Sequence, residues 1–566
     1  MGLTLEQLKE KGLAPEFLNE HGLQTLEGGY LNNDESPYDM YKRIANAAGS
    51  YFKDSEKWSL KFFDYMWKGW LCPASPVLSN MGTNRGMPIS CNSEHIGDSM
   101  NSIGMKAHEL MMLSKNGAGV GIYLGDLRGR GTKIGQNGVS EGVIPWCKIY
   151  DSVTVAVSQG TTRRGASAVY LPIEHSDIDE FINIRRPTGD INRRCLNLHN
   201  AVCISNDWMQ QMLNGDKHKR ELWKEILKTR VETGEPYVLF SDNVNNHRPQ
   251  SYIDNNLFIK TSNICSEILQ YTDPNNTFVC CLSSLNLLYW EQWKDTDLIE
   301  TTVRFLDAVL QEYINKIKDT PGFESALNSV LRERSIGIGV LGFHSLLQSK
   351  MLPMDSFQTM MLNADIFRTI KQKAEIGTQQ LFEEIGTTSF LQPYKRRNNF
   401  LLALAPTVSN SIISGGLSPS IEPWAANIFS IKSAKGTFIK KNLELQKLLN
   451  NKNKDTIETW QQINKDNGSV KNLPFLTKEE KEVFLTAREI NQHQLVKLAA
   501  QRQPFIDQGQ SLNLFFTKDS DPKYIHEVHL GAWELGIKTL YYLRSESVLN
   551  GDSVYRSKDE CAACEG

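Results

Sequence analysis

Hydrophobic residues recur at two spacings along this chain, and together these predict an α/β protein. Up to about Trp70 they follow the helical period, with polar residues between them. Beyond that point, short apolar runs of strand length alternate with helix-like segments, and glycine-rich turns separate them. We find no internal repeat. The chain is longer than a usual single domain, but large barrels also exceed that size and still form one unit. We therefore expect a helical region followed by one dominant α/β domain.

Three segments give more detailed predictions. Residues 521–536 predict a helix that Asp521 and Pro522 begin and Gly536 ends, with one apolar face made of Tyr524, Val528, Ala532 and Leu535. Residues 400–404 predict a short apolar strand. The stretch 450–472 is rich in Asn, Lys and Asp, which indicates an exposed, partly helical insertion.

Composition excludes several classes of protein. A net charge of −3 and a pI near 6.4 give no basic excess, so we expect neither nucleic acid nor a membrane surface as a partner. No apolar run approaches the ~20 residues of a spanning helix, and the first residues resemble neither a signal peptide nor, at Glu6, a myristoylation site. Ten cysteines in a chain of this length do not indicate a disulfide scaffold. Redox-active thiols need a reducing compartment, so we expect the cytoplasm, or the host's if the chain is viral.

The motif Asn263-Ile264-Cys265-Ser266-Glu267 is the most informative one in the chain. If this segment is extended, Asn263, Cys265 and Glu267 project from one face. The sulfur could then act on a substrate carbon while the carboxylate takes a proton from a neighbouring hydroxyl that the amide holds. A buried cysteine in a hydrophobic core is the other interpretation of the motif alone.

A pair of cysteines, Cys561 and Cys564, ends the chain after a polar run. Two thiols at this spacing on an arm can close a disulfide by exchange and so carry reducing equivalents. The chain has no second Cys-x-x-Cys pair and no histidine near this tail, which disfavours a structural zinc site within one chain. A zinc site shared between two molecules stays open. Cys91 and Cys280 are thiols that could form the internal disulfide that this arm would reduce.

Taken in order from about Leu13 to the end, these motifs resemble the large, catalytic (alpha) subunit of a class I ribonucleotide reductase. The resemblance implies reduction of ribonucleoside diphosphates to 2′-deoxyribonucleotides. Cys265 would carry a transient thiyl radical that abstracts the substrate's 3′ hydrogen, Glu267 would deprotonate the 3′ hydroxyl, and Asn263 would bind the sugar. Cys91 and Cys280 would supply the electrons.

The resemblance also implies partners. Cys561 and Cys564 would reduce the internal disulfide, and a thioredoxin or glutaredoxin would recharge them. Tyr541 and Tyr542 match the tyrosine pair that passes a radical from a small (beta) subunit, which would hold the metal or radical cofactor; none is expected on this chain. Two adjacent aromatics also suit a buried strand. Alignment of the motifs selects Cys280 over its neighbour, which would face the other way on a strand.

A substrate-phosphate loop is expected directly after the strand at 400–404. Hydroxyls and backbone amides gather there, and they can hold phosphate oxygens if the loop opens a helix. An ordinary capped turn is the alternative. By resemblance, the diphosphate contacts would be Thr407, Val408, Ser409, Asn410 and Ser411, with Val408 standing where some relatives carry a polar residue. Ser75 and Ser90 are weaker expected substrate contacts.

Three segments rich in Gly, Ser and Arg, at 97–102, 125–131 and 158–165, follow the order of the family's specificity-site loops. Each alone could be a solvated turn. By resemblance, a dNTP or ATP effector would contact Asp98, Ser99 and Arg128, and Gln159 and Arg163 would relay its identity. The family completes this site at a dimer interface, and the apolar positions of 98–115 suit a packing helix (Met100, Ile103, Leu110 and Met111). A homodimer is therefore expected.

The family fold is a ten-stranded α/β barrel, in which two five-stranded parallel halves surround a central finger loop with the radical cysteine. We accordingly expect an N-terminal helical region at 1–70, the barrel with its specificity loops at 71–547, and a redox tail at 548–566. Only some 25 residues precede the segment 26–30, so we expect no N-terminal ATP cone and no inhibition by dATP through one.

Two other functions remain open on the sequence. Adenosylcobalamin-dependent class II reductases share the Asn-x-Cys-x-Glu pattern, commonly with proline where this chain has Ile264, and use no tyrosine pathway to another subunit. The other is a noncatalytic nucleotide-binding or dithiol protein. In that case the five cysteines, the two tyrosines and Glu267 would occur together without a catalytic function.

Overall fold

The computed structural model describes residues 3–136, 138–157, 165–433 and 436–545, with the backbone alone for 430–438. Its first part is helical, as predicted. Ser36 caps one of these helices through a reciprocal pair of bonds with Asp39, and Pro37 occupies the first turn. Tyr38 on this helix packs edge-on against Phe63 of the next. The four helices are α1 (Leu5–Glu10), α2 (Glu20–Glu27), α3 (Pro37–Gly49) and α4 (Ser55–Trp67).

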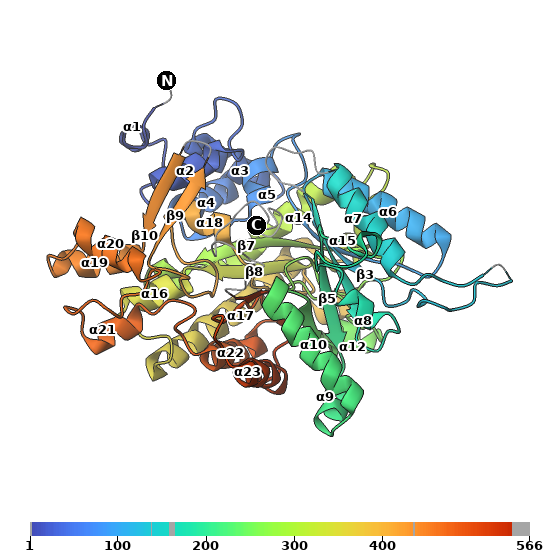
Figure 1. The fold of residues 1–566 in the computed structure, drawn as a ribbon. Helices are drawn as coiled ribbons and strands as arrows, with labels where there is room; N and C mark the ends of the chain where they lie inside the picture. The colour runs from blue at the N-terminus through green and yellow to red at the C-terminus, as the bar shows by residue number, and fades with distance from the viewer. Residues whose placement is uncertain (1–2, 137, 158–164, 434–435, 546–566) are drawn as a thin grey trace.

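A mixed sheet follows, and Figure 1 shows it in the middle of the molecule with helices around it. Its order is β1-β7-β2-β3-β4-β5-β6-β12, and β8 also pairs with β7. The run β2 to β6 is parallel throughout, and a helix crosses between each successive pair. The strands are β1 (Leu71–Pro73), β2 (Cys91–His95), β3 (Gly119–Tyr123), β4 (Ala166–Pro172), β5 (Leu198–Ile204), β6 (Tyr237–Phe240), β7 (Phe278–Asn286), β8 (Ile336–Leu341) and β12 (Thr539–Leu540).

The remaining wall is less regular than β2–β6. β7 runs antiparallel to β2 and parallel to β8. Beyond β8, single parallel bridges join Ile338 to Leu402 and Leu404 to Gln510, and a two-residue ladder joins β11 (Leu514–Phe515) to β13 (Leu543–Arg544). In place of the predicted strand at 400–404, the structure therefore has two isolated bridges, at Leu402 and Leu404. The predicted α/β barrel with an N-terminal helical region is confirmed, with one wall curled and regular and the other built from short pieces.

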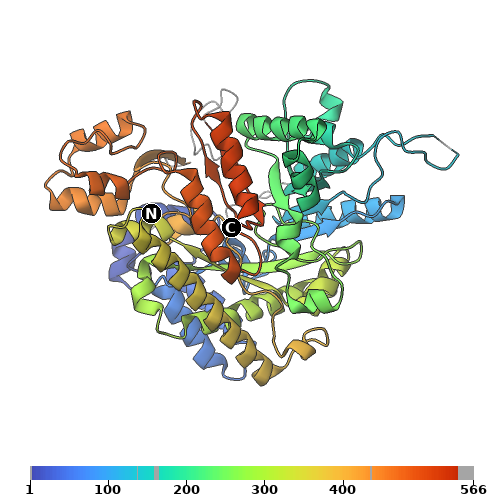
Figure 2. The ribbon, with the colours of Figure 1, turned by 90° about the horizontal axis from the view of Figure 1, so that it is seen from below.

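Helices cover the outside of these walls (Figure 2). Those that follow β1 in the chain, up to the end of β7 and just after it, are α5 (Ser75–Asn80), α6 (Met100–Lys115), α7 (Ile144–Val157), α8 (Ile178–Phe181), α9 (Asn206–Leu213), α10 (Lys217–Thr233), α11 (Ser241–Asn245), α12 (Gln250–Asp254) and α13 (Trp290–Trp293). The others are α14 (Leu298–Ile317), α15 (Glu324–Glu333), α16 (Phe343–Ser349), α17 (Phe357–Ile385), α18 (Val408–Ile413), α22 (Gln492–Arg502) and α23 (Pro522–Glu534).

A lobe with its own small core projects from one side, opposite the long loop between β3 and α7 (Figures 1 and 2). It contains the hairpin β9 (Ile428–Ser433) and β10 (Gly436–Lys441), with α19 (Leu443–Asn451), α20 (Ile457–Lys465) and α21 (Lys478–Val483). The polar stretch 450–472 lies here and is partly helical, as predicted. Trp460 and Ile463 within it are nevertheless buried in the lobe's core.

The C-terminal helix α23 begins as predicted, with Asp521 as its cap and Pro522 in its first turn. Val528 and Ala532 on its expected apolar face are buried, whereas Leu535 is exposed. The prediction for Leu535 was wrong because the helix ends at Glu534 and the next residue leaves the helical face. Within the described part of the chain, no helix combines the length and apolarity needed to cross a membrane.

Candidate active site

The Asn-x-Cys-x-Glu motif forms a tight turn in the centre of the barrel rather than an extended segment. Ser266 lies in the left-handed region with φ of 65°, so the chain reverses after Cys265. The amide of Asn263 donates to Oε1 of Glu267 at 3.0 Å. Our prediction that alternation on a strand brings these side chains together was therefore wrong, because a turn does so.

Strands of the regular wall hold one side of this finger loop. An ideal Cβ on Gly121 of β3 would lie 1.8 Å from the carbonyl oxygen of Ser262, so only glycine permits the loop to approach this closely. Tyr170 of β4 is fully buried and donates to the carbonyl of Asn263 at 2.6 Å. The sequence reasoning missed Tyr170, since one buried aromatic among many gives no signal.

The segment 509–511 holds the other side. The N–H of Gly509 donates to the carbonyl of Glu267 at 2.7 Å. Ser511 Oγ lies 2.6 Å from the carbonyl of Cys265 and 3.1 Å from Oε2 of Glu267. Its hydroxyl therefore supports both the backbone of the cysteine and the carboxyl group. Ser511 was also missed, because it lies 244 residues from Glu267 in the chain.

Four of the predicted catalytic side chains line one pocket: Cys265, Glu267, Cys91 and Cys280. The predicted substrate contact Ser90 borders the same pocket, together with Pro406 at the start of the phosphate loop. Burial raises the pKa of Glu267 to about 7, and hydrogen bonds from its own backbone, Asn263 and Ser511 limit the rise. A carboxyl with this pKa can both take and return a proton near neutral pH.

Cys91 and Cys280 face each other across the β2–β7 ladder as directly paired residues. Paired residues of antiparallel strands have Cα atoms about 4.5–5.5 Å apart, within the range that a disulfide spans. Cys281 also borders the pocket, but its thiol contacts the carbonyl of Leu306 at 3.3 Å. The geometry thus favours Cys280 as the partner of Cys91. Cys561 and Cys564 lie outside the described residues.

The expected phosphate loop is a sharp turn that opens the short helix α18. Thr407 has a φ of 55°, and its Oγ1 accepts the N–H of Ser420 at 2.8 Å. Asn410 contacts both Ser75 (3.4 Å) and the carbonyl of Pro73 (2.9 Å). The structure therefore brings Ser75 to the loop formed by Thr407, Val408, Ser409, Asn410 and Ser411.

The two tyrosines lie between β12 and β13, in the hydrophobic cluster that also contains Cys265. The rings of Tyr541 and Tyr542 have centroids 4.3 Å apart at 52°. A third ring, that of Tyr237 on β6, lies 4.8 Å from the first and 5.1 Å from the second. The pair is thus both a core element and an aromatic continuation of the site, with its rings in contact but tilted.

Two of the predicted effector contacts meet at the ends of β2 and β3. Nε of Arg128 lies 2.8 Å from Oδ2 of Asp98. Ser99 caps α6 by accepting the N–H of Ser102. Gln159 and Arg163 lie outside the described residues. The ion pair marks an exposed polar corner of the regular wall.

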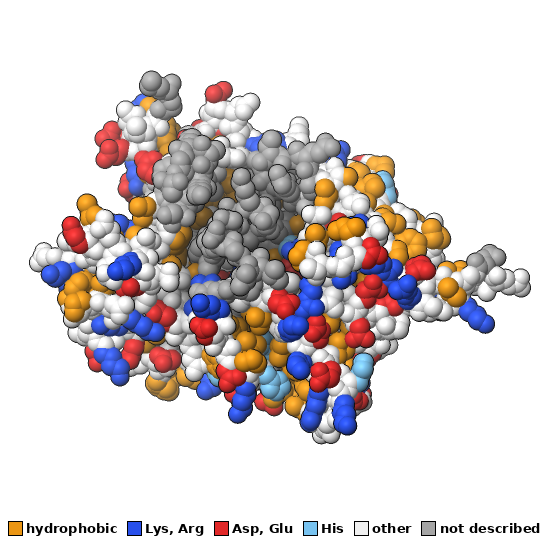
Figure 3. Space-filling view, viewed as in Figure 1, with side chains coloured by type: hydrophobic (Ala, Val, Ile, Leu, Met, Phe, Trp, Pro, Cys, Tyr) orange, Lys and Arg blue, Asp and Glu red, His pale blue; other side chains and the backbone are white. Residues whose placement is uncertain are grey.

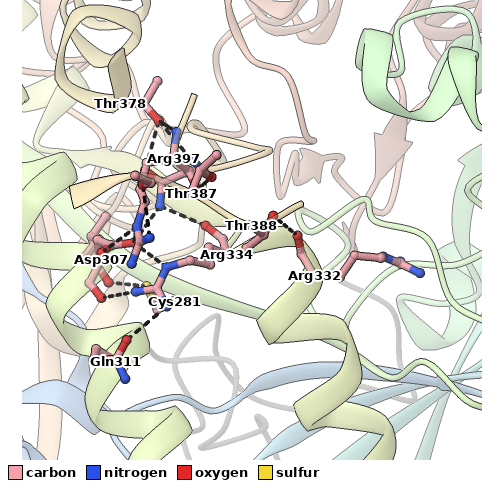
Figure 4. A network of polar contacts seen from close by, with 12 residues as sticks. Cys281, Asp307, Gln311, Arg332, Arg334, Thr378, Thr387, Thr388 and Arg397 are labelled. Carbon is pink, nitrogen blue, oxygen red and sulfur yellow. Dashed lines mark hydrogen bonds and ion pairs between the residues drawn. The ribbon is translucent and has the colours of Figure 1, made fainter. Parts of the chain in front are cut away.

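A buried charged network supports the irregular wall behind Cys281 (Figure 4). Asp307 of α14 accepts from Arg334 at 2.8 Å, from Arg397 at 3.3 Å and from the amide of Asn398 at 3.1 Å. Burial alone would raise the pKa of Asp307, but the two guanidinium groups hold it below its usual value. The network fixes α14, the start of β8 and the strand segment near 400 to one another.

Within the residues that the structure describes, no group of three or more His, Cys, Asp or Glu side chains could hold a metal ion. The reactive groups of the pocket are thiols and a carboxyl group.

Known proteins match both the fold and this site's segment of the chain. The family model for the ribonucleotide reductase barrel domain matches residues 89–219, 217–395 and 390–543, and the model for its all-alpha domain matches 16–86. The ribonucleoside-diphosphate reductase large subunit of Invertebrate iridescent virus 3 is 36% identical over 96% of this chain and 98% of its own. A putative large subunit from Frog virus 3 is 38% identical over 89% and 92%, respectively.

Among solved structures, the class Id ribonucleotide reductase alpha subunit of Actinobacillus ureae superposes with a TM-score of 0.87 at 40% identity. The match covers 94% of this chain and 98% of the other. The chain therefore belongs to the family of ribonucleotide reductase large subunits.

Proposed function

We propose that this chain is the catalytic large subunit of a class I ribonucleoside-diphosphate reductase. The observation that carries the proposal is the single pocket shared by Cys265, Glu267, Cys91 and Cys280. Radical abstraction, proton transfer and two-electron reduction each need a different group, and all must reach one sugar. A pocket enclosed by the barrel also keeps a sulfur radical from solvent.

In the proposed reaction, a thiyl radical on Cys265 takes the 3′ hydrogen of the ribose. Glu267 takes the proton of the 3′ hydroxyl, for which a pKa of about 7 is well matched. Asn263 holds both the carboxylate, at 3.0 Å, and the hydroxyl. The 2′ hydroxyl leaves as water, and Cys265 finally returns a hydrogen atom to the 3′ carbon.

Cys91 and Cys280 supply the two electrons and two protons of the reduction and become a disulfide. Their direct pairing across β2 and β7 supports this role. Cys561 and Cys564 on the tail at 548–566 would reduce that disulfide, and a thioredoxin or glutaredoxin would recharge the tail. Such cycling requires a reducing compartment, which favours the cytoplasm, including a host's.

A separate small subunit would supply the radical, whose cofactor chemistry is that subunit's. The adjacent rings of Tyr541 and Tyr542, in one cluster with Cys265, support a route for the radical into the pocket. The ribonucleoside diphosphate would place its phosphates on the turn at Thr407 and the first turn of α18, with Ser75 and Ser90 nearby.

A homodimer with a dNTP or ATP effector site is part of the proposal. Figure 3 shows hydrophobic side chains gathered over α6 and α7. Met100 (72%), Met105 (60%) and, on α7, Val155 (53%) leave most of their apolar side chains exposed. A patch of exposed apolar side chains is typical of an interface between proteins. Asp98 and Arg128 lie at the base of the same helices and would contact the effector's sugar and phosphates, with Gln159 and Arg163 as relays.

The test is CDP reduction with ATP or dATP as effector and dithiothreitol as reductant. The chain should be inactive alone, inactive with adenosylcobalamin, and active with its cognate small subunit. Activity with adenosylcobalamin alone would show a class II enzyme and leave Tyr541 and Tyr542 as core residues. No activity under any of these conditions would support a noncatalytic protein.

A further inference from the structure

The two cysteines that pair across β2 and β7 have unequal surroundings. The exposed fraction of Cys91 is 9%, whereas that of Cys280 is 1%. An incoming thiol must approach the sulfur that it attacks along the S–S axis, and the other sulfur must leave as a thiolate. Access alone therefore favours attack on Cys91 and departure of Cys280. This inference rests on the dithiol chemistry proposed above.

A fully buried glutamine, Gln508, points its amide nitrogen at the second sulfur. Its Nε2 lies 3.6 Å from Sγ of Cys280 and donates to the carbonyl of Ile336 at 3.0 Å. Its Oε1 accepts the backbone N–H of Leu269 at 3.3 Å and the amide of Gln270 at 3.1 Å. A backbone N–H can only donate, so the oxygen must face Leu269 and the nitrogen must face Cys280.

The backbone of Gln508 is held as firmly as its side chain. Its carbonyl accepts from Nζ of Lys538 at 2.9 Å and from the amide of Gln503 at 3.1 Å, and its N–H donates to Leu402. Both ends of the residue are therefore fixed, and the N–H that faces the sulfur is in place before any charge develops there.

A donor in this position matters most when the sulfur is charged. Burial raises the pKa of Cys280 well above the usual value of a thiol, and the amide of Gln508 works against that rise. A neutral disulfide sulfur gains little from the N–H, whereas a departing thiolate gains a charge-assisted hydrogen bond inside an apolar pocket.

We propose that Gln508 is a positioning residue that makes Cys280 the leaving sulfur, so that the attacking thiol always joins Cys91. In the first step the attacking thiolate forms an S–S bond to Cys91. The Cys91–Cys280 bond breaks, and Cys280 leaves with the electron pair and takes up the proton that the attacking thiol released. In the second step another thiolate attacks the first external sulfur, and Cys91 leaves and is protonated. One disulfide is thereby reduced as two thiols are oxidised.

The direction can be read in the full chain carrying Cys561→Ser and Cys564→Ser, so that added glutathione is the sole attacking thiol. The chain is oxidised by one turnover with its small subunit, mixed briefly with glutathione, quenched in acid and alkylated with N-ethylmaleimide. Peptide mapping should find glutathione on Cys91 and the alkyl group on Cys280. Glutathione on Cys280, or on both equally, would overturn the proposal. If oxidation gives no Cys91–Cys280 disulfide, the dithiol chemistry itself fails, and the assigned direction fails with it.

Variants separate the role of Gln508 from mere packing. Gln508→Leu keeps the size of the side chain but removes the N–H, together with the oxygen that Leu269 and Gln270 use. We expect exchange at least about tenfold slower, the loss of one hydrogen bond to a charged group. The share of glutathione found on Cys280 should rise. Gln348→Leu is the matched control, because Gln348 is equally buried but contacts His344 and Val483. An unchanged rate and an unchanged distribution in Gln508→Leu would contradict the proposal.

Discussion

The two walls of the barrel are built on different principles. β2 to β6 form five parallel strands in continuous ladders, with a helix between each pair. The wall from β8 onwards has single bridges and takes much of its support from side chains. Asp507, for example, accepts the N–H groups of Leu401 and Leu402 at 2.9 and 2.8 Å, where a regular sheet would have used another strand.

The chemistry is distributed unevenly between these walls. The regular wall contributes Cys91 and, at its strand ends, the corner of Asp98 and Arg128. The finger loop's carboxyl, the second thiol and both tyrosines are all held by the segments 508–513 and 539–544. A wall with few ladder bonds leaves backbone and side-chain groups available to position other side chains, and the groups of the proposed site are held mainly by this wall.

The largest expected effect tests whether the finger loop is the centre of this arrangement. Cys265→Ser should lower turnover with the small subunit by at least about 10⁴-fold, because serine forms no comparable radical. The other groups of the pocket cannot act without the radical, so the loss of Cys265 alone should remove almost all activity. Cys203→Ser is the control, since Cys203 is buried in the same cluster. Measurable CDP reduction by Cys265→Ser would remove the loop from the mechanism.

Glu267→Gln should cost about 10²–10⁴-fold in kcat/KM, the usual contribution of a general base. In the unmodified chain, kcat/KM should rise with pH through about 7, because the carboxylate is the active form. The variant should lose this rise. A profile that kept the same midpoint in Glu267→Gln would assign it to another group.

Glu267 should also make stability fall with rising pH, whereas kcat/KM should rise. Its folded-state pKa of about 7 exceeds the ordinary 4.5, so the folded chain binds the proton more tightly, and the free energy of unfolding falls as pH rises from about 4.5 to about 7. By pH 8 the cost is about 3 kcal/mol. Glu267→Gln should therefore match the unmodified chain at pH 4.5 and exceed it at pH 8 in urea unfolding.

Asp307→Asn tests the irregular wall without touching the pocket. The change leaves the guanidinium groups of Arg334 and Arg397 buried without their shared carboxylate, which costs about 3–5 kcal/mol. Urea unfolding should detect this loss, whereas Asp355→Asn on the surface should leave stability unchanged. Equal stability of both variants would show that the bridges alone hold this wall.

Asp98→Ala in the regular wall should have the smallest effect. Both members of its ion pair are about one-third exposed (34% and 37%), so stability should change by less than about 1 kcal/mol. The ATP concentration that gives half-maximal CDP reduction should rise about tenfold, because the effector loses one hydrogen bond to a carboxylate. An unchanged ATP response would place the effector elsewhere.

The same contrast explains what the sequence could predict. Periodicity and glycine-rich turns identify the regular wall and the N-terminal helices, because both follow from local spacing. The motifs identify Cys265, Glu267 and the cysteine pair. Periodicity alone could not give the strand number of the other wall, which came from the family resemblance, because several backbone groups of that wall bond to side chains such as Asp507. Tyr170 and Ser511 were missed because they reach the finger loop from distant parts of the chain.

Gly121 has a consequence for how this protein can vary. The finger loop rests directly on its Cα, with 1.8 Å between an imagined methyl carbon and the carbonyl oxygen of Ser262. Even alanine would force the loop that carries Cys265 to shift. The smallest residue of an interior strand thus sets how closely the loop that carries Cys265 can lie against the regular wall. Variation at this position is therefore restricted to glycine as long as the loop keeps its place.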